Sequence, residues 1–190
     1  MYNIEIRRPR IEDNEELNQF FSKVIRETFA SEGLSEMLDD IENEIENKKQ
    51  YLKCDFDSNG QNRFFWIALD NNDNKVIGSI EYGPVSELIN ICTDGALKEW
   101  FEVGTVFVHP DYQRRGIGTL LLNVMLLTLQ IRGIEEFCLD SGYTNAQKIW
   151  KKKFGEPDYL LKDYWGEGCD HMIWKRCTNE MSIKFRTLFN

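Results

Sequence analysis

One stretch of the chain, residues 106–118, limits what the sequence can fold into more than any other. An apolar run rich in β-branched residues ends at Pro110, a short polar loop follows, and two glycines open a long apolar segment. Runs of this composition form strands, and proline ends them because it has no backbone N–H to donate. The pattern predicts a strand over 101–108, a loop, and a helix over 116–132 that is buried on nearly all sides.

The loop between this strand and this helix has the features of an anion-binding site. N–H groups in the first turn of a helix have no intrahelical acceptors, and the helix dipole places positive charge behind them. Arg114 and Arg115 add positive charge in front of them. Two common phosphate-binding motifs do not fit. Thr119 follows Gly118 where a Walker loop has lysine, and Leu121 stands where the dinucleotide fingerprint has its third glycine. We therefore expect a pyrophosphate cradle of another kind.

The rest of the chain alternates strand and helix patterns. Further strands are predicted at 2–8, 64–69, 75–82, 135–140, 159–165 and 171–177. Helical spacing predicts one helix from Glu12 to a stop at Gly33 and another over 145–154. A further helix between them is predicted to bury one face made of Leu34, Met37, Leu38, Ile41 and Ile45. Residues 87–100 are interpreted as a connection. This order indicates a mixed α/β sheet with helices packed on it.

Charge and composition exclude several classes of protein. The net charge of −9 argues against general nucleic-acid binding. Residues 12–57 hold 14 acidic and 5 basic residues, and they therefore carry the whole excess. This acidic block is either a solvated helix surface or a rim that attracts cations.

The five cysteines include no Cys-x-x-Cys pair, and there are two histidines, so neither a disulfide framework nor a metal site is expected. No run of 18 apolar residues and no signal peptide are found, which favours a cytoplasmic protein without a membrane partner.

Residues 113–118, with the order Gln-Arg-Arg-Gly-Ile-Gly, resemble the signature of the GNAT superfamily of acetyl-CoA-dependent N-acetyltransferases. Val-His-Pro at 108–110 precedes the signature, as is common in that family. A weaker match is the segment 145–155, which looks like the family's Asn-x-Ala…Tyr…Gly helix. Residues 8–13 look like its N-terminal opening. The resemblance extends over roughly residues 2–177.

The resemblance implies a fold, an acyl donor and a set of binding residues. The fold is a single-domain α/β structure with a mixed, splayed β-sheet flanked by helices, over residues 1–177, with 178–190 as a C-terminal extension. The donor is acetyl-CoA, and no metal is involved. Backbone groups of one strand would pair with the pantetheine arm, and the loop would hold the pyrophosphate. The implied donor-binding residues are Val106, Phe107, Val108, Gln113, Arg114, Arg115, Gly116, Ile117, Gly118, Thr119, Asn145 and Trp150.

Catalysis in this family is direct acyl transfer to an amine, and the resemblance implies one residue for it and a departure at another. Glu102 stands at the position of the base in the histone-type members, although an ordinary surface-facing strand glutamate is the alternative. The family's helix usually offers a tyrosine as general acid, and here Trp150 takes that position. An indole N–H cannot protonate a thiolate. Either the thiolate leaves unaided or another group serves as the acid, and the candidates are Tyr143, Tyr159 and Tyr164.

The acceptor is predicted only as a class. The acidic block favours a cationic small-molecule or peptide amine, such as a polyamine, an aminoglycoside-like amine, a protein lysine or an N-terminus. Two other activities stay open. One is a CoA-binding module that has lost catalysis, which the tryptophan at position 150 permits. The other is transfer of a longer acyl group, against which the bulk of Trp100, Phe101 and Trp150 argues mildly. The oligomeric state is open, with a homodimer among the options.

Overall fold

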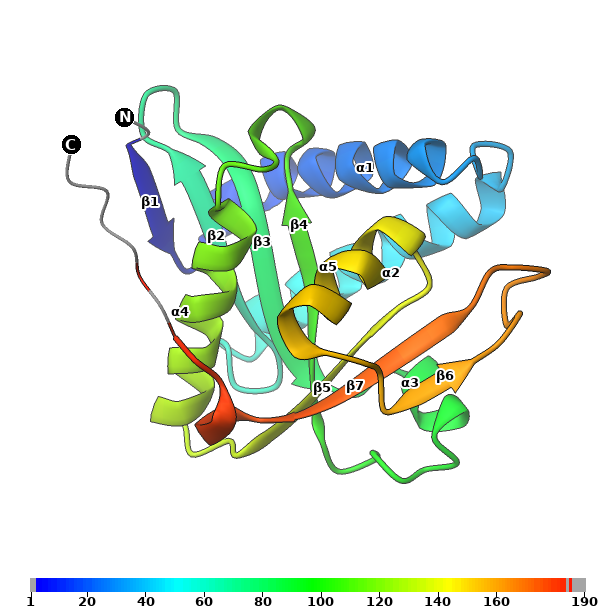
Figure 1. Ribbon diagram of the computed structural model, residues 1–190. Helices are drawn as coiled ribbons and strands as arrows, with labels where there is room; N and C mark the ends of the chain where they lie inside the picture. Colours follow the sequence, from blue (N-terminus) through cyan, green and yellow to red (C-terminus); the bar gives the residue numbers. More distant parts are fainter. Residues whose placement is uncertain (1–2, 184, 186–190) are drawn as a thin grey trace, which may run out of the picture. The chain divides into compact units, whose positions relative to one another are not determined.

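The structure is a computed structural model that describes residues 3–183 and 185. Strands form one mixed sheet in the order β1-β2-β3-β4-β5-β7-β6, flanked by helices (Figure 1). The strands are β1 (Ile4–Arg7), β2 (Phe64–Asp70), β3 (Lys75–Pro84), β4 (Phe101–Val108), β5 (Glu136–Ser141), β6 (Tyr159–Leu161) and β7 (His171–Cys177). The helices are α1 (Asn14–Ser31), α2 (Leu38–Asp57), α3 (Glu87–Cys92), α4 (Ile117–Ile131) and α5 (Thr144–Phe154). The predicted class, an α/β fold with a mixed sheet, is confirmed.

Strand directions make the sheet mixed. β1 runs antiparallel to β2, from the pair Ile4↔Asp70 to the pair Arg7↔Ile67. β7 runs antiparallel to both β5 and β6. β4 and β5 run parallel, and their register joins Phe101 to Phe137 and Glu102 to Cys138. This parallel register lies at the beginning of β4, and it places Glu102 beside a buried cysteine.

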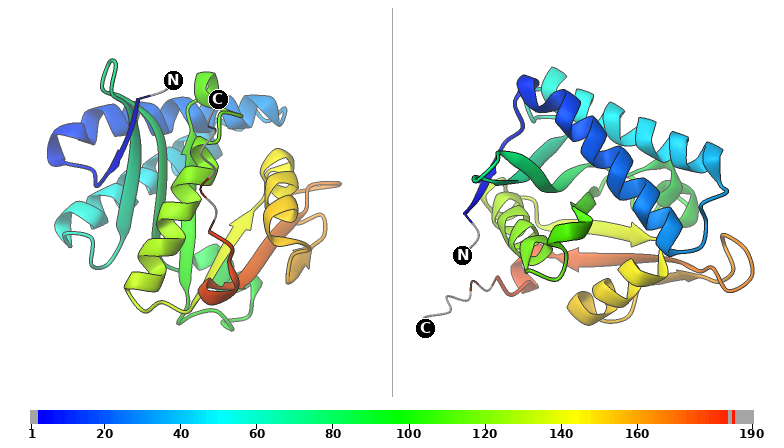
Figure 2. Two further views of the ribbon diagram at one scale, coloured as in Figure 1. Left: turned by 60° about the vertical axis from the view of Figure 1, so that its left-hand side comes forward. Right: turned by 90° about the horizontal axis from the view of Figure 1, so that it is seen from above.

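The described chain divides into two compact units, and the first comprises residues 3–81, 105–128, 182, 183 and 185. Within it, α1 and α2 cover one face of the strands and α4 covers the other (Figure 2). The apolar spacing of α1 and α4 explains this placement, since each turns a stripe of apolar side chains toward the sheet. The core side chains that these helices contribute include Leu17, Phe21, Ile25, Ile41, Ile45, Leu52, Leu121 and Met125.

The start of α2 differs from the sequence prediction. Leu34, Met37 and Leu38 were predicted to share a buried face with Ile41 and Ile45. The helix begins only at Leu38, and Met37 and Leu38 are 42% and 61% exposed. That part of the prediction is wrong because Leu34 and Met37 precede the helix, where helical spacing does not apply, and because Leu38, the first residue of α2, is exposed to solvent. The buried face is made of Ile41, Ile45, Leu52 and Asp55.

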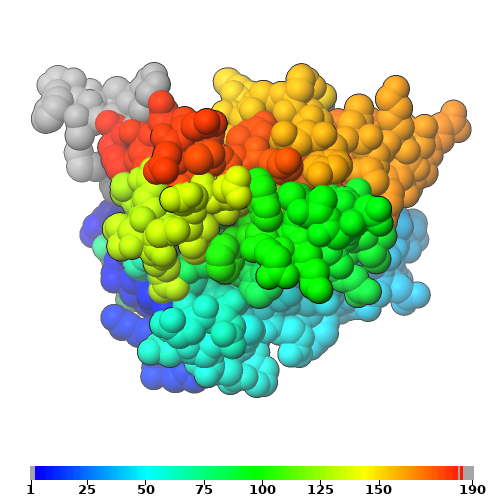
Figure 3. Space-filling model, turned by 90° about the horizontal axis from the view of Figure 1, so that it is seen from below, coloured from blue at the N-terminus to red at the C-terminus, as the bar shows by residue number. Residues whose placement is uncertain are grey.

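The second compact unit comprises residues 82–104 and 129–181. It contains α3, a helix that falls in the stretch interpreted from sequence as a connection. Ser86 caps α3, because its hydroxyl accepts a hydrogen bond from the N–H of Ile89. Ile89 then packs in a cluster with Leu97, Cys138 and Ile173. Figure 3 shows the outer surface of this segment in green.

The segment after α5 contains a shorter strand than predicted. A strand was expected over 159–165, but β6 ends at Leu161 and turns occupy the chain as far as β7. Glycines at 166 and 168, both with positive φ, and Asp163, with φ of 54°, are incompatible with a continuous strand. The sequence prediction for 162–165 is therefore wrong, and these residues belong to the loop between β6 and β7.

The predicted C-terminal extension, 178–190, begins as part of the second unit. Thr178 is buried, its N–H donates to the carbonyl of Glu135 at 2.8 Å, and its hydroxyl donates to the carbonyl of Ile134 at 3.0 Å. Residues 184 and 186–190 of the predicted extension lie outside the described residues. Among the helices that the structure describes, none is long and apolar enough to cross a membrane.

Candidate active site

The loop before α4 is anchored to β2 and β3 within the first unit. The N–H of His109 donates to the carbonyl of Ile77 at 2.9 Å, and the Nδ1 of His109 accepts from the N–H of Asp111 at 3.3 Å. The hydroxyl of Tyr112 donates to Oδ2 of Asp70 at 3.1 Å. The loop is therefore held at both ends of its short 3-10 turn, Pro110–Tyr112.

Two left-handed residues turn the chain from this loop into α4. Arg114 has φ of 59° and Gly116 has φ of 87°, and α4 begins at the next residue, Ile117. No atom that is distant in the chain lies within 4 Å of the position that a Cβ on Gly116 would occupy, so the space beside this residue is open. The guanidinium of Arg115 lies 5.2 Å from the ring centroid of Tyr112. Helix-terminal N–H groups, a nest-like backbone and arginine side chains together form a site suited to an anion.

The structure places the predicted loop residues in different environments. Gln113, Arg114, Arg115, Gly116 and Thr119 are exposed. In contrast, the side chain of Ile117 is 2% exposed and belongs to the core. Any contact of Ile117 with a ligand in front of the helix is therefore restricted to its backbone N–H. The amide of Gln113 donates to the carbonyl of Val108 at 3.3 Å, which ties the loop back to the end of β4.

Gly78, on β3, is a residue that sequence reasoning missed. A Cβ at this position would lie 2.9 Å from Cδ1 of Leu121, 3.2 Å from Cγ2 of Ile117 and 3.2 Å from the carbonyl oxygen of Phe107. The first turn of α4 can approach the strands this closely because position 78 has no side chain. Gly78 thus determines where the helix N-terminus lies.

We expect Gly78→Ala to destabilise the first unit. The added methyl group overpacks the contact with α4, which costs about 1–3 kcal/mol of unfolding free energy. Gly118→Ala on α4 is the matched control. Its added Cβ would lie 3.5 Å from Cγ2 of Val108, which is an ordinary van der Waals distance. That variant should be neutral or stabilising, since alanine is the better helix former. Urea unfolding of the two variants measures the difference, and equal stabilities would contradict the assignment of Gly78.

His109 lies buried beneath the loop as a neutral side chain. Burial lowers the pKa of His109, and the charges of Lys75 and Lys23 lower it further. The folded protein therefore disfavours the imidazolium, whereas the unfolded chain takes up the proton below a pH of about 6.5. Because the unfolded state binds more protons in that range, the unfolding free energy falls as the pH decreases below that value.

We expect His109→Asn to reduce this pH dependence. Asparagine retains an acceptor for the N–H of Asp111 and has no titrating group. The measurement is the unfolding free energy of both proteins at pH about 5 and about 7. The decrease on acidification should be smaller in the variant. An identical decrease would show that other groups account for the acid sensitivity.

The end of β4 supplies the predicted contacts for the pantetheine arm. Val106, Phe107 and Val108 are half-buried. The ring of Phe107 packs edge-on against Phe21 of α1, with centroids 6.1 Å apart and the planes at 70°. Thr105, just before them, has φ of 48°, which is unusual for a β-branched residue in a strand.

Glu102 lies in the second unit and is buried. Its residue is 6% exposed, and its Oε2 accepts the N–H of Ser86 at 2.6 Å. Glu102 and Cys138 are neighbours in the parallel register. Burial raises the pKa of the Cys138 thiol, and the carboxylates of Glu102 and Asp140 raise it further, so this thiol stays protonated. The alternative that Glu102 is an ordinary surface glutamate is therefore wrong, because its side chain is buried.

The other predicted residues of the second unit lie on or next to α5. Tyr143 is the residue that precedes α5, and its N–H donates to the hydroxyl of Ser141 at 3.1 Å. Asn145 is exposed in the first turn. Trp150 stacks on Phe154, with centroids 5.7 Å apart and the planes at 17°. One face of the indole is thereby occupied within the helix itself.

Tyr164, one of the two further candidate acids, has a hydrogen-bond partner that changes its acidity. Its pKa is raised by a hydrogen bond with Cys92 and by burial. A phenol held in this way is a weaker proton donor than usual. Tyr164 thus suits a structural role better than the role of general acid.

The buried side chain of His171, the first residue of β7, is a second feature that the sequence did not indicate. His171 is 1% exposed, its Nδ1 accepts from the indole N–H of Trp165 at 3.2 Å, and its Nε2 lies 3.1 Å from Oδ2 of Asp140. A Cβ on Gly142 would lie 2.6 Å from the indole nitrogen of Trp165. The indole therefore depends on a glycine and a histidine for its place, and it holds the loop between β6 and β7 against β5.

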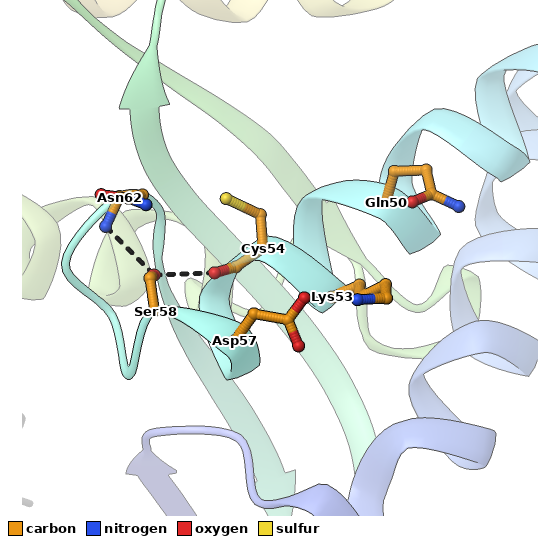
Figure 4. Close-up of a pocket in the computed structure, with 6 residues that line it drawn as sticks. All are labelled: Gln50, Lys53, Cys54, Asp57, Ser58 and Asn62. Atoms are coloured by element: carbon orange, nitrogen blue, oxygen red, sulfur yellow. Dashed lines mark hydrogen bonds and ion pairs between the residues drawn. The ribbon is translucent and has the colours of Figure 1, made fainter.

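A hollow at the end of α2 is lined by Gln50, Lys53, Cys54, Asp57, Ser58 and Asn62 (Figure 4). The hydroxyl of Ser58 donates to the carbonyl of Cys54 at 2.7 Å and accepts from the N–H of Asn62 at 3.1 Å, and Lys53 pairs with Asp57. The hollow contains none of the predicted site residues, and its polar groups largely bind one another. It also offers no metal site, because the described residues contain no group of three or more metal-ligating side chains.

Comparison with known families identifies the class of protein to which this fold and loop belong. The model of the acetyltransferase (GNAT) family matches residues 25–155, which is more than half of the chain. The chain therefore belongs to the GNAT family of acetyltransferases. No curated protein sequence matches the chain.

Solved structures of this family have the same fold at low sequence identity. A putative GNAT acetyltransferase from Desulfovibrio desulfuricans superposes with a TM-score of 0.67 at 15% identity, covering 92% of this chain and 99% of that one. The PaiA N-acetyltransferase from Thermoplasma acidophilum, solved in complex with coenzyme A, gives 0.64 at 21% identity, with the same coverage of 92% and 99%. The ribosomal-protein-S5-alanine acetyltransferase from Vibrio fischeri gives 0.63 at 16% identity, covering 96% and 97%.

Proposed function

We propose that the protein is an N-acetyltransferase that moves the acetyl group of acetyl-CoA directly to a primary amine. The observation that carries the proposal is the loop before α4, in which Arg114 and Gly116 adopt left-handed conformations directly before the helix N-terminus, with open space beside Gly116. This geometry is suited to a pyrophosphate. Membership of the GNAT family and the coenzyme A complex of the PaiA protein support coenzyme A as the molecule that carries it.

The donor would contact three sets of residues. Backbone groups of Val106, Phe107 and Val108 would pair with the pantetheine arm as an added strand does. Backbone N–H groups from Gln113 to Thr119, together with the side chains of Arg114 and Arg115, would hold the pyrophosphate. Asn145 and Trp150 of α5 would complete the contacts near the thiol end. The Trp150 contact would be made by the indole edge or its free face, because Phe154 covers the other face.

The reaction removes two protons from the acceptor ammonium nitrogen, one before and one after attack, and delivers one proton to the sulfur. Glu102 would accept the proton of the acceptor ammonium, directly or through a water molecule. The amine nitrogen then attacks the thioester carbonyl carbon, the carbon–sulfur bond breaks, and the thiolate leaves with the bonding electron pair. Tyr143 would give a proton to that sulfur, and the second proton of the amine nitrogen would restore the phenol, so that the net proton released is the one on Glu102. The N–H of Ser86 donates to Oε2 of Glu102 at 2.6 Å, which orients the carboxylate.

A coenzyme-binding module without turnover is the second candidate. The observation that favours it is Trp150, which stands where the family usually has a tyrosine and whose indole stacks on Phe154 instead of offering a titrating group. In this case the loop would still bind coenzyme A, and no acetyl group would be transferred.

A screen for release of free thiol from acetyl-CoA separates the two candidates. The purified protein is incubated with acetyl-CoA and a panel of amines that includes polyamines, aminoglycosides, lysine peptides and peptides with free N-termini. Thiol release that depends on one class of amine supports the transferase. Binding of CoA by calorimetry without release above background would establish the module. A longer acyl-CoA in place of acetyl-CoA tests the remaining alternative for the donor.

The acidic block supports a cationic acceptor. Asp39 and Asp40 are exposed in the first turn of α2, and further along the helix Glu42 pairs with Arg26 and Glu44 pairs with Lys48. The pairs neutralise part of the block, so its field is strongest near the helix start. Carboxylates there also interact favourably with the helix dipole, which is a structural reason for the same residues.

Charge reversal at Asp39 and Asp40 should raise the KM for the acceptor and leave the KM for acetyl-CoA nearly unchanged. A field of this kind is screened over about 8–10 Å at physiological salt, so the acceptor kcat/KM of the unaltered protein should also fall with added salt. Reversal of Glu135 and Glu136, two exposed adjacent acids outside the block, is the matched control. If the acceptor KM changes neither with added salt nor with charge reversal at Asp39 and Asp40, the block serves only solubility.

A further inference from the structure

Thr105 adopts a backbone conformation that its residue type disfavours. It lies inside β4 with φ of 48° and is 5% exposed. The other described non-glycine residues with positive φ are Asn59, Asn74, Asp94, Arg114 and Asp163. Most of these are asparagine or aspartate, which tolerate the left-handed region, whereas a β-branched residue there is strained. Such strain persists only where surrounding groups hold it.

Two side chains of β3 form hydrogen bonds with Thr105, one with its hydroxyl and one with its carbonyl oxygen. Its hydroxyl donates to Oε1 of Glu81 at 3.1 Å. Its carbonyl oxygen accepts the hydroxyl of Ser79 at 2.9 Å. Ser79 and Glu81 are both fully buried, so neither contact competes with solvent. The turn at Thr105 is therefore fixed by hydrogen bonds that a regular strand would not need.

Glu81 is in turn held by a buried ion pair. Its Oε2 accepts Nη1 of Arg63 at 2.6 Å, and the two side chains are 0% and 7% exposed. The guanidinium of Arg63 lies 3.7 Å from the ring centroid of Tyr51 on α2. Buried ion pairs contribute little net stability compared with apolar residues of the same volume. The pair is thus better explained by the conformation that it enforces than by the stability that it adds.

The enforced conformation lies immediately before the strand residues that face the donor in the proposed function. A left-handed residue within a strand bends it in the manner of a bulge and sets the direction of the residues that follow. Those residues are Val106, Phe107 and Val108. On the other side, the carbonyl of Phe107 approaches Gly78 closely, which limits how far the strand can move.

We propose that Arg63, Ser79, Glu81 and Thr105 are positioning residues for the acyl donor. They fix the left-handed turn in β4 before the donor arrives, so that the backbone of 106–108 is already oriented for the pantetheine arm. Orientation of this kind lowers the ordering cost of binding and keeps the thioester in reach of the amine. The inference rests on the proposed function, because it assigns these residues to the same donor site.

Variants at position 105 test the inference. Thr105→Val removes the hydroxyl and keeps the shape, whereas Thr105→Ser keeps the hydroxyl and is the conservative rescue. Thr105→Gly also removes the hydroxyl, and glycine adopts a positive φ without strain. If the valine variant does not fold, the glycine variant still shows the effect of removing the hydroxyl. Glu81→Gln tests the next link, because it leaves an acceptor for Thr105 and removes the charge that Arg63 needs.

Three quantities are measured for each variant: the Kd for CoA by calorimetry, the kinetic constants of thiol release, and the melting temperature of the free protein. For the valine and glycine variants we expect a weaker Kd and a kcat/KM for acetyl-CoA that falls by up to about 10²-fold, with the acceptor KM little changed. Thr105→Ser should stay close to the unaltered protein. A purely structural role would lower the melting temperature and leave the Kd of the folded protein as it was.

The outcomes separate this inference from the proposed function. If the unaltered protein does not bind CoA, the proposed function and this inference fall together. If it binds CoA and the valine and glycine variants bind and turn over equally well, the inference alone is overturned and the donor site stands. A loss in the serine variant as large as that in the valine variant would also overturn it, because the hydroxyl would then have no role.

Discussion

Gly116→Asp should abolish binding of coenzyme A. Position 116 lies directly before the first turn of α4, with φ of 87° and no atom that is distant in the chain within 4 Å of its absent Cβ. A side chain there would occupy that open space, next to the helix N–H groups, and its negative charge would repel a pyrophosphate. Calorimetric titration with CoA measures the loss. Both steric and electrostatic effects act in the same direction, so this is the largest effect expected on the donor side.

Two controls isolate these effects. Gly116→Asn has the same size as the aspartate variant without its charge, and asparagine tolerates positive φ, so it should retain part of the affinity. Gly33→Asp places an aspartate in a matching setting, with φ of 76° and open space, at the end of α1. That variant should bind CoA normally. A folded Gly116→Asp protein with unchanged affinity would remove the loop from the donor site.

Local signals in the sequence were sufficient to predict the loop and the elements around it. β4 and β7 lie at their predicted bounds, and α4 differs by one residue at each end. These elements can be predicted because the spacing of their apolar residues and the prolines and glycines at their ends are local signals in the sequence. The left-handed turn before α4 likewise depends on Gly116, whose conformational freedom is a property of the residue itself.

Features that depend on contacts between distant residues could not be predicted in this way. Arg63 and Glu81 are 18 residues apart, and Thr105 is a further 24 residues along the chain. In the sequence each appears as a single polar residue in or next to a strand, which usually faces solvent. Gly78 in the same way looks like an ordinary interruption of a strand. Its role appears only when α4 is placed on β3.

The errors at α2 and β6 have different origins. Apolar spacing was extended back to Leu34, but nothing in that stretch marks a helix start, and the helix begins at Leu38. Tyrosine and tryptophan at 164 and 165 favoured a strand, whereas the two glycines that follow and the contact of Trp165 with His171 form a loop. In α2 the spacing was extended past the helix start, and after β6 the local propensity was overridden by the structure of the loop.

Glu102→Gln should lower kcat by about 10²–10⁴-fold near neutral pH if this carboxylate is the base. It should also remove the acidic limb of the pH–rate profile, because that limb reports the protonation of the base. The amide retains an oxygen that can accept the N–H of Ser86, so the fold around position 102 should be preserved. Steady-state thiol release across pH, with the amine identified by the screen, gives both quantities.

The control for Glu102 is Glu136→Gln, an exposed glutamate at the start of β5 that should not affect turnover. A decrease in kcat of less than about threefold for Glu102→Gln, with the acidic limb intact, would show that the carboxylate only caps α3 through Ser86. The two roles differ in a second respect. A capping role predicts a lower melting temperature for Glu102→Ala with an unaltered pH profile in the folded enzyme. A base predicts loss of the limb in both variants, whatever their stability.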